Sequence, residues 1–153
     1  MDTYKNATGN KNQTNSAVRS EVITKAIQEK SYENEITDWF YMTPNEVTAK
    51  MISDLIKLQN GITVDLWEEM NILQLELSNR ITVDFEPIII NFKDPSDAAF
   101  VRNRKIKTIF EVTMEEAALS EMKEVLRMIF DAWDGFLCAD TDDFKPIYRK
   151  EDL

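Results

Sequence analysis

The stretch that decides the fold is residues 73–85, which read LQLELSNRITVDF. Leucine occupies every second position from 73 to 77, and Ile, Val and Phe do the same from 81 to 85. A period of two with one polar side is typical of an antiparallel strand that buries one face. The polar residues 78–80 between the two runs predict a turn, in which Asn79 tolerates a positive φ.

This pattern predicts a hairpin over about 72–90. Pro87 limits the second strand or marks a bulge, and Ile88–Ile90 are expected to continue it as a buried run. Shifting either strand by one residue would expose its apolar side chains, so the register is expected to be fixed. A further strand is predicted at about 106–113 from its apolar spacing.

Two capping boxes predict the starts of helices. Thr43-Pro-Asn-Glu46 precedes an apolar pattern with helical spacing, which predicts a helix at about 44–59 that ends at Asn60-Gly61. Thr113-Met-Glu-Glu116 precedes a longer pattern of the same kind, which predicts a helix at about 114–133 closed by Gly135.

The remaining segments give weaker patterns. Residues 62–70 are compatible with either a strand or a short helix, and both alternatives stay open. The other expectations are a helix from residue 17 to 27, a short helix or turn at 36–41, a short helix from Asp94 and a frayed end at 145–153. Residues 136–139 could form a last short strand, which could add one parallel pair with the strand at 106–113.

Together these elements predict the α+β class. The expected order is N-terminal helices, then an antiparallel sheet made of the hairpin at about 72–90 and the strand at about 106–113, covered by the long helix at about 114–133. Residues 1–16 are almost free of apolar side chains and predict a disordered polar tail. Residues 17–153 are expected to form a single domain.

The net charge of the chain limits the kinds of partner that it can bind. The chain has 28 acidic residues, 18 basic residues and a net charge of −10. This balance repels nucleic acid and anionic membranes and favours a basic protein partner. The sequence contains no apolar run long enough to span a membrane, and its single cysteine fits a cytoplasmic protein.

The chain contains few of the residue types that catalysis usually requires. The chain has no histidine, so Ser–His and Cys–His nucleophiles are excluded. Cys138 lies between apolar neighbours and is expected to be a small core residue. No zinc set exists, residues 140–151 lack the glycine of a calcium loop, and no phosphate-binding loop occurs. We therefore expect neither an enzyme nor a metal or other cofactor.

The densest acidic stretch, residues 131–143, forms the predicted partner-binding site together with Phe144. Its aspartates would supply charge, and Phe144 and Trp133 would be anchors. The preferred function is a small acidic protein-binding module, an inhibitor or immunity protein that blocks a basic partner such as a bacterial toxin. A nucleic-acid mimic and a carboxylate-based or metal-dependent enzyme are the alternatives, and a monomer or a homodimer is expected. The predicted site residues are Asp131, Trp133, Asp134, Asp140, Asp142, Asp143 and Phe144.

Overall fold

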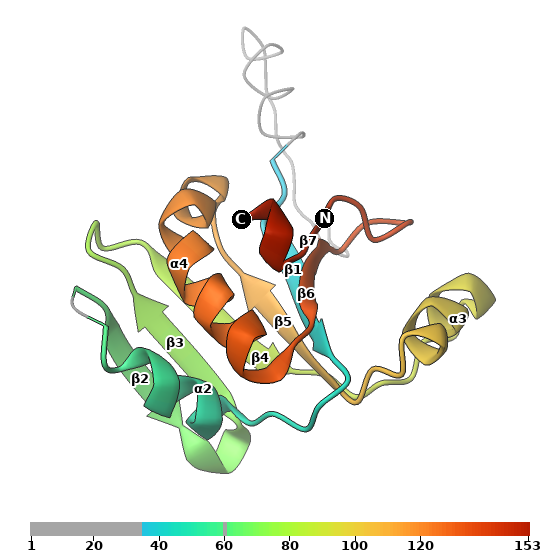
Figure 1. Cartoon of the computed structure of the whole chain (residues 1–153), viewed down its shortest axis with the longest axis horizontal. Coiled ribbons are helices and arrows are strands. Elements are labelled where there is room, and N and C mark those ends of the chain that lie inside the picture. Colours follow the sequence, from blue (N-terminus) through green and yellow to red (C-terminus); the bar gives the residue numbers. More distant parts are fainter. Residues whose placement is uncertain (1–34, 60) are drawn as a thin grey trace, which may run out of the picture. The chain divides into compact units, whose positions relative to one another are not determined.

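The computed structural model describes residues 35–59 and 61–153. Residues Ile36–Leu153 form one compact unit around a seven-stranded sheet with the order β2-β3-β4-β5-β1-β6-β7, in which every neighbouring pair is antiparallel (Figure 1). The strands are β1 (Asp38–Thr43), β2 (Thr63–Trp67), β3 (Ile72–Glu76), β4 (Thr82–Pro87), β5 (Thr108–Thr113), β6 (Phe136–Ala139) and β7 (Ile147–Tyr148).

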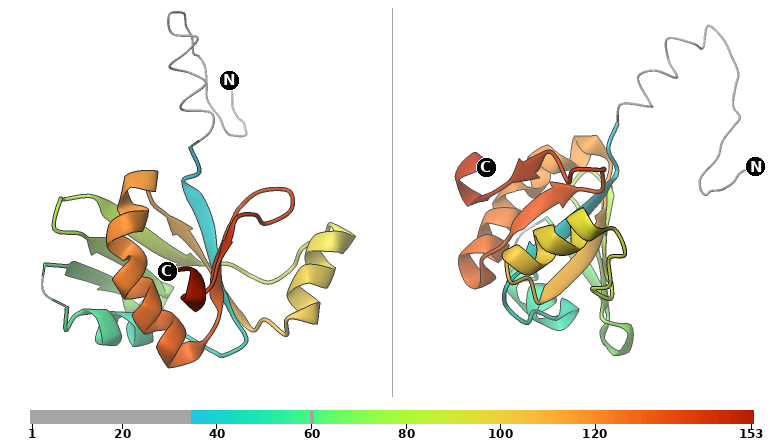
Figure 2. Two further views of the ribbon diagram at one scale, coloured as in Figure 1. Left: turned by 45° about the horizontal axis from the view of Figure 1, so that its top comes forward. Right: turned by 90° about the vertical axis from the view of Figure 1, so that its right-hand side faces the viewer.

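In the described part of the chain, three α-helices pack on this sheet: α2 (Ala49–Ile56), α3 (Pro95–Asn103) and α4 (Glu116–Trp133). Helices α2 and α4 share the main apolar core with one face of the sheet, whereas α3 packs on a second, smaller core on the other face (Figures 1 and 2). Two short 3₁₀-helices, η1 (Glu68–Met70) and η2 (Lys150–Asp152), complete the described elements. The α+β class is therefore confirmed.

The predicted hairpin and its register are also confirmed. Leu73 pairs with Phe85 and Leu75 with Val83, and all four side chains are buried in the main core. The residue with positive φ in the connecting turn is Arg80, at +73°, and not Asn79. Asn79 instead accepts a hydrogen bond from Ile81 N through its Oδ1, which tightens the turn by another route.

Strand β1 corrects the expected helix or turn at 36–41. This strand lies between β5 and β6, so it buries side chains on both faces. Trp39 and Tyr41 face the main core, and Phe40 and Met42 face the second core. A strand buried on both faces shows no polar alternation, which is why the period of two was absent from this segment.

Helix α2 begins later than the predicted 44–59. Its N-cap is Thr48, whose side chain accepts a hydrogen bond from Met51 N. The predicted cap, Thr43, is the last residue of β1, and its hydroxyl donates to the backbone oxygen of Trp133 at 2.6 Å. Thr43 therefore ties β1 to the end of α4 instead of starting a helix.

Helix α4 confirms the long predicted helix but not its cap. Its N-cap is Glu115, without a side-chain capping bond, so the capping box predicted at Thr113 is wrong. The expected parallel pair of the strands at 106–113 and 136–139 is also wrong. Strand β1 lies between β5 and β6 and pairs antiparallel with both.

Two further expectations about ordered ends are corrected. Ile88–Ile90 do not continue the hairpin, because β4 ends at Pro87 and Ile89 is 88% exposed. The segment 145–153 is not frayed throughout, since β7 pairs with β6 and Leu153 packs against the main core. The predicted tail at 1–16 and helix at 17–27 lie outside the described residues.

Candidate binding surface

The residues of the predicted acidic stretch do not gather into one site. Asp131, Trp133 and Asp134 belong to the end of α4, and Asp131 forms an ion pair with Lys150. Strand β6 then separates them from Asp140 and the loop that follows it (Figure 1). The sequence neighbours therefore lie at the two ends of a buried strand.

The expectation of an exposed Phe144 anchor is wrong. Phe144 has a positive φ of +60° and is only 4% exposed. Its ring lies 4.5 Å from the ring of Phe100 and 6.1 Å from that of Phe40, between centroids, so it is part of the second core. Trp133 is half-buried and packs against the main core.

The loop after β6 uses its polar groups internally. Asp143 Oδ1 accepts hydrogen bonds from Lys145 N and from the Thr141 hydroxyl, and the same hydroxyl reaches Lys145 O at 2.9 Å. Asp142 remains exposed. These bonds hold the loop closed over Phe144, which gives Asp143 a structural role.

A different surface concentrates both charge and apolar side chains. On the sheet face opposite α2 and α4, strands β2, β3 and β4 direct alternate side chains outward, and these are exposed or half-buried. We call this surface the open face. Its residues are Thr63, Asp65, Trp67, Ile72, Gln74, Glu76, Thr82, Asp84 and Glu86.

The acidic residues of the sheet all lie on this side. The seven described strands carry six carboxylates and no Lys or Arg, and the registers place all six on the face away from α4. Four belong to the open face, and Asp38 and Glu111 extend the series across β1 and β5. The charged side chains of the strands therefore all lie on one face of the sheet, which the total of −10 does not reveal.

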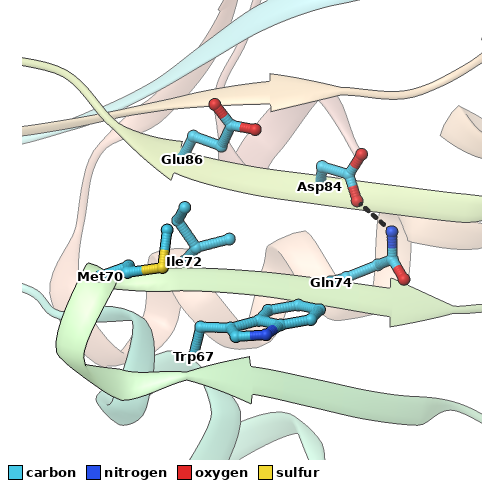
Figure 3. Close-up of a pocket in the computed structure, with 6 residues that line it drawn as sticks. All are labelled: Trp67, Met70, Ile72, Gln74, Asp84 and Glu86. Carbon is cyan, nitrogen blue, oxygen red and sulfur yellow. Dashed lines mark hydrogen bonds between the residues drawn. The ribbon is translucent and has the colours of Figure 1, made fainter.

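A shallow apolar hollow lies at one end of the open face (Figure 3). Trp67 and Ile72 pair across β2 and β3, and Met70 closes the hollow from η1. Trp67 is 48% exposed and Met70 is 61% exposed. Asp84 and Glu86 form the acidic wall, and Gln74 Nε2 donates to Asp84 Oδ1 at 2.8 Å.

The connection between β2 and β3 positions this hollow. Asn71 adopts the left-handed conformation that ends η1, with φ 58° and ψ 40°. Its Oδ1 accepts a hydrogen bond from Ala49 N at 2.6 Å, which satisfies a free amide in the first turn of α2. This bond fixes the turn that carries Trp67 and Met70 to a core helix.

Two further large apolar side chains are exposed after the end of β4, Ile89 at 88% and Ile90 at 37%.

Two carboxylates with raised pKa values lie beyond the open face, half-buried Glu111 on β5 and Asp140 directly after β6. Burial raises the pKa of Glu111 above its usual value, and Asp38, Asp140 and Glu86 add to the effect. Partial burial, together with Asp38 and Asp97, likewise raises the pKa of Asp140. Repulsion between these carboxylates lowers the stability of the fold. A cationic side chain of a partner, bound beside them, would relieve that repulsion.

The sequence did contain a signal for this surface. Trp67 and Ile72 are apolar, yet they lie on the same side of their strands as the polar residues Asp65 and Gln74. A reading of 62–70 as a strand would have placed Trp67 on the outward side. The sequence of 62–70 fits a helix equally well, so it does not by itself place Trp67 on a binding surface.

No protein-family model matches the chain, and no curated protein or solved structure matches it either. Within residues 35–59 and 61–153, no group of three or more His, Cys, Asp or Glu side chains has the arrangement of a metal site. The same described part contains no helix of the length and apolar character that a membrane span requires.

Proposed function

We propose that this chain is an acidic protein-binding module that holds a basic partner on its open face. The observation that carries the proposal is the coincidence of exposed Trp67 and Met70 with Asp84 and Glu86 around one hollow. Aromatic and Met anchors surrounded by polar residues are the usual composition of a binding hot spot. This arrangement moves the proposed contact away from the acidic stretch at 131–143.

Within this class we propose an inhibitor of a basic enzyme, of the immunity-protein type. A net charge of −10 accelerates encounter with a basic protein, and the acidic wall beside Trp67 supplies local complementarity. An inhibitor of this kind requires a surface and no reactive group of its own.

The exposed apolar side chains favour this function over a nucleic-acid mimic. Duplex DNA presents an unbroken series of phosphates, with one charge per about 1.7 Å of its axis. Trp67 and Met70 are exposed beside the carboxylates of the open face, and a phosphate backbone has no counterpart for such apolar anchors.

The test compares two variants of equal charge in affinity capture at low and high salt. The face variant combines Asp65→Asn, Asp84→Asn and Glu86→Gln, and the loop variant combines Asp140→Asn, Asp142→Asn and Asp143→Asn. Each removes three negative charges, and Asn at position 143 keeps the Oδ1 acceptor that holds the loop, so a difference between the variants reports position and not net charge.

We expect the wild-type protein and the loop variant to retain the same basic protein, and the face variant to lose it. Retention by wild type should weaken at high salt, because exposed charges are screened there. If both variants lost the partner equally, binding would depend on net charge and not on the open face. If only the loop variant lost the partner, the binding site would lie in the acidic stretch.

A further inference from the structure

We infer that the partner binds as an extended basic segment that adds to the free edge of β2 as another strand of the sheet. This inference rests on the proposed function and specifies how the open face recognises its partner. Strand β2 is the first strand of the sheet and pairs with β3 alone. Among the described residues, the backbone of Thr63–Trp67 makes no further hydrogen bond.

The edge of β2 has little of the usual protection against strand addition. Exposed edges are commonly protected by charged side chains, above all lysine, or by proline, a bulge, a very short strand or a covering helix or loop. Strand β2 is five residues long, reads TVDLW and pairs in regular register with β3, so its one charged side chain is Asp65, which opposes an acidic strand but not a basic one. At the opposite edge of the sheet, β7 has only two residues. Alternate backbone groups of β2 therefore point away from the sheet and can pair with an added strand.

Charge determines which strand would fit. A strand added beside β2 extends the open face, so its outward side chains would lie next to Asp65 and Trp67. Lys or Arg opposite Asp65 would form a cross-strand ion pair. An apolar residue opposite Trp67 would extend the apolar hollow that Ile72 and Met70 line. The occupant is thus an extended segment with alternating basic side chains.

A second copy of this chain fits the edge less well. Asp65 is the central residue of β2, so two such strands that pair around a centred two-fold axis would place Asp65 opposite Asp65. Like charges directly opposite each other destabilise a strand pair. The same contact would also bring together two chains of net charge −10.

The test is a titration of the full chain with three short peptides. For each peptide, the affinity and the hydrogen exchange of the backbone amides are measured. The first peptide alternates Lys and Val. The second has the same side chains but N-methyl groups on alternate amides, which block pairing along one edge. The third replaces each Lys by Glu.

We expect the Lys–Val peptide to bind and to slow exchange at alternate amides of Thr63–Trp67. The N-methylated peptide should bind at least about tenfold more weakly, since it loses the backbone hydrogen bonds. Equal binding of these two peptides would overturn strand addition but leave a basic contact on the open face. Equal binding of the Glu peptide would overturn both the inference and the proposed basic preference.

Two other results would also overturn the inference. No protection of Thr63–Trp67 by the Lys–Val peptide would mean that the edge does not accept a basic strand. Protection of these amides without any peptide, together with a dimer mass in sedimentation, would mean that a second copy occupies the edge.

Discussion

The close approach of Gly135 to strand β1 makes a sharp prediction about stability. Gly135 has a φ of +104°, and a Cβ built there would lie 2.3 Å from Met42 O and 2.9 Å from Tyr41 Cε1. The same turn is held by the Tyr41 hydroxyl, which donates to Asp134 O at 2.8 Å. The Gly135→Ala variant must therefore strain its backbone and push the end of α4 away from β1.

The magnitude follows from these two effects. A left-handed conformation costs a residue with a Cβ about 1–2 kcal/mol. Moving the turn weakens hydrogen bonds worth about 1 kcal/mol each, including those of Tyr41 and Thr43 to the end of α4. We therefore expect Gly135→Ala to lower the free energy of unfolding by about 3 kcal/mol.

Gly61 provides the matched control. Its φ is also positive, at +85°, but a Cβ there would meet only Ser78 Cβ at an ordinary 3.7 Å. Gly61→Ala should thus cost about 1 kcal/mol from the backbone alone. Urea unfolding of both variants, followed by tryptophan fluorescence and circular dichroism, measures the difference. Values within half a kcal/mol of each other would refute the close approach of the turn to β1.

Three further predictions concern the core and the carboxylates. Leu75→Ala should destabilise the protein by about 2–5 kcal/mol in the same urea assay, because Leu75 is fully buried; a loss below half a kcal/mol would contradict its register. Glu111→Gln should stabilise the protein at pH 7 by up to about 1 kcal/mol, because it removes a half-buried charge that Asp38, Asp140 and Glu86 repel. The pKa of Glu111 is raised in the folded state, so its ionisation costs stability as pH rises, and the gain should vanish in acid; a gain that persists there would contradict this cause. Burial raises the pKa of the Cys138 thiol to about 12. A thiol reagent at pH 8 should therefore react with Cys138 only as fast as the protein unfolds. An immediate reaction would show that the thiol is accessible in the folded protein.

The sequence predicted best those elements that have one polar side. The hairpin shows its register because Leu73, Leu75 and Val83 alternate with outward polar residues. The short helix from Asp94 was also visible, because Asp94 accepts hydrogen bonds from the amides of Ser96 and Asp97 and Pro95 follows it. Local chemistry and tertiary environment agree at these places.

Elements whose environment comes from distant segments were missed. Phe40 and Tyr41 face different cores, so β1 presents no polar side from which its period can be recognised. Phe144 stands among aspartates in the sequence, yet its left-handed backbone and the aromatic rings of Phe92 and Phe100 hold it inside. Neither arrangement follows from neighbouring residues alone.

The predicted site shows the same limit. Acidic residues close in sequence were assigned to one surface, but β6 separates them. The acids of the open face are up to about twenty residues apart in the chain, and strand pairing brings Asp65 and Asp84 onto the same side. Register, not local charge density, determines where negative charge gathers on a sheet.

The central claim is that a basic protein docks on the open face around Trp67. The most direct measurement is the affinity of the captured partner for Trp67→Ala and for Leu58→Ala, by titration calorimetry. Leu58 is a matched control, since it is an exposed apolar residue that follows α2, away from the open face. The account predicts a loss of about 30-fold or more for Trp67→Ala, as for an interface hot spot, and almost none for Leu58→Ala. Wild-type affinity in the Trp67→Ala variant would contradict it.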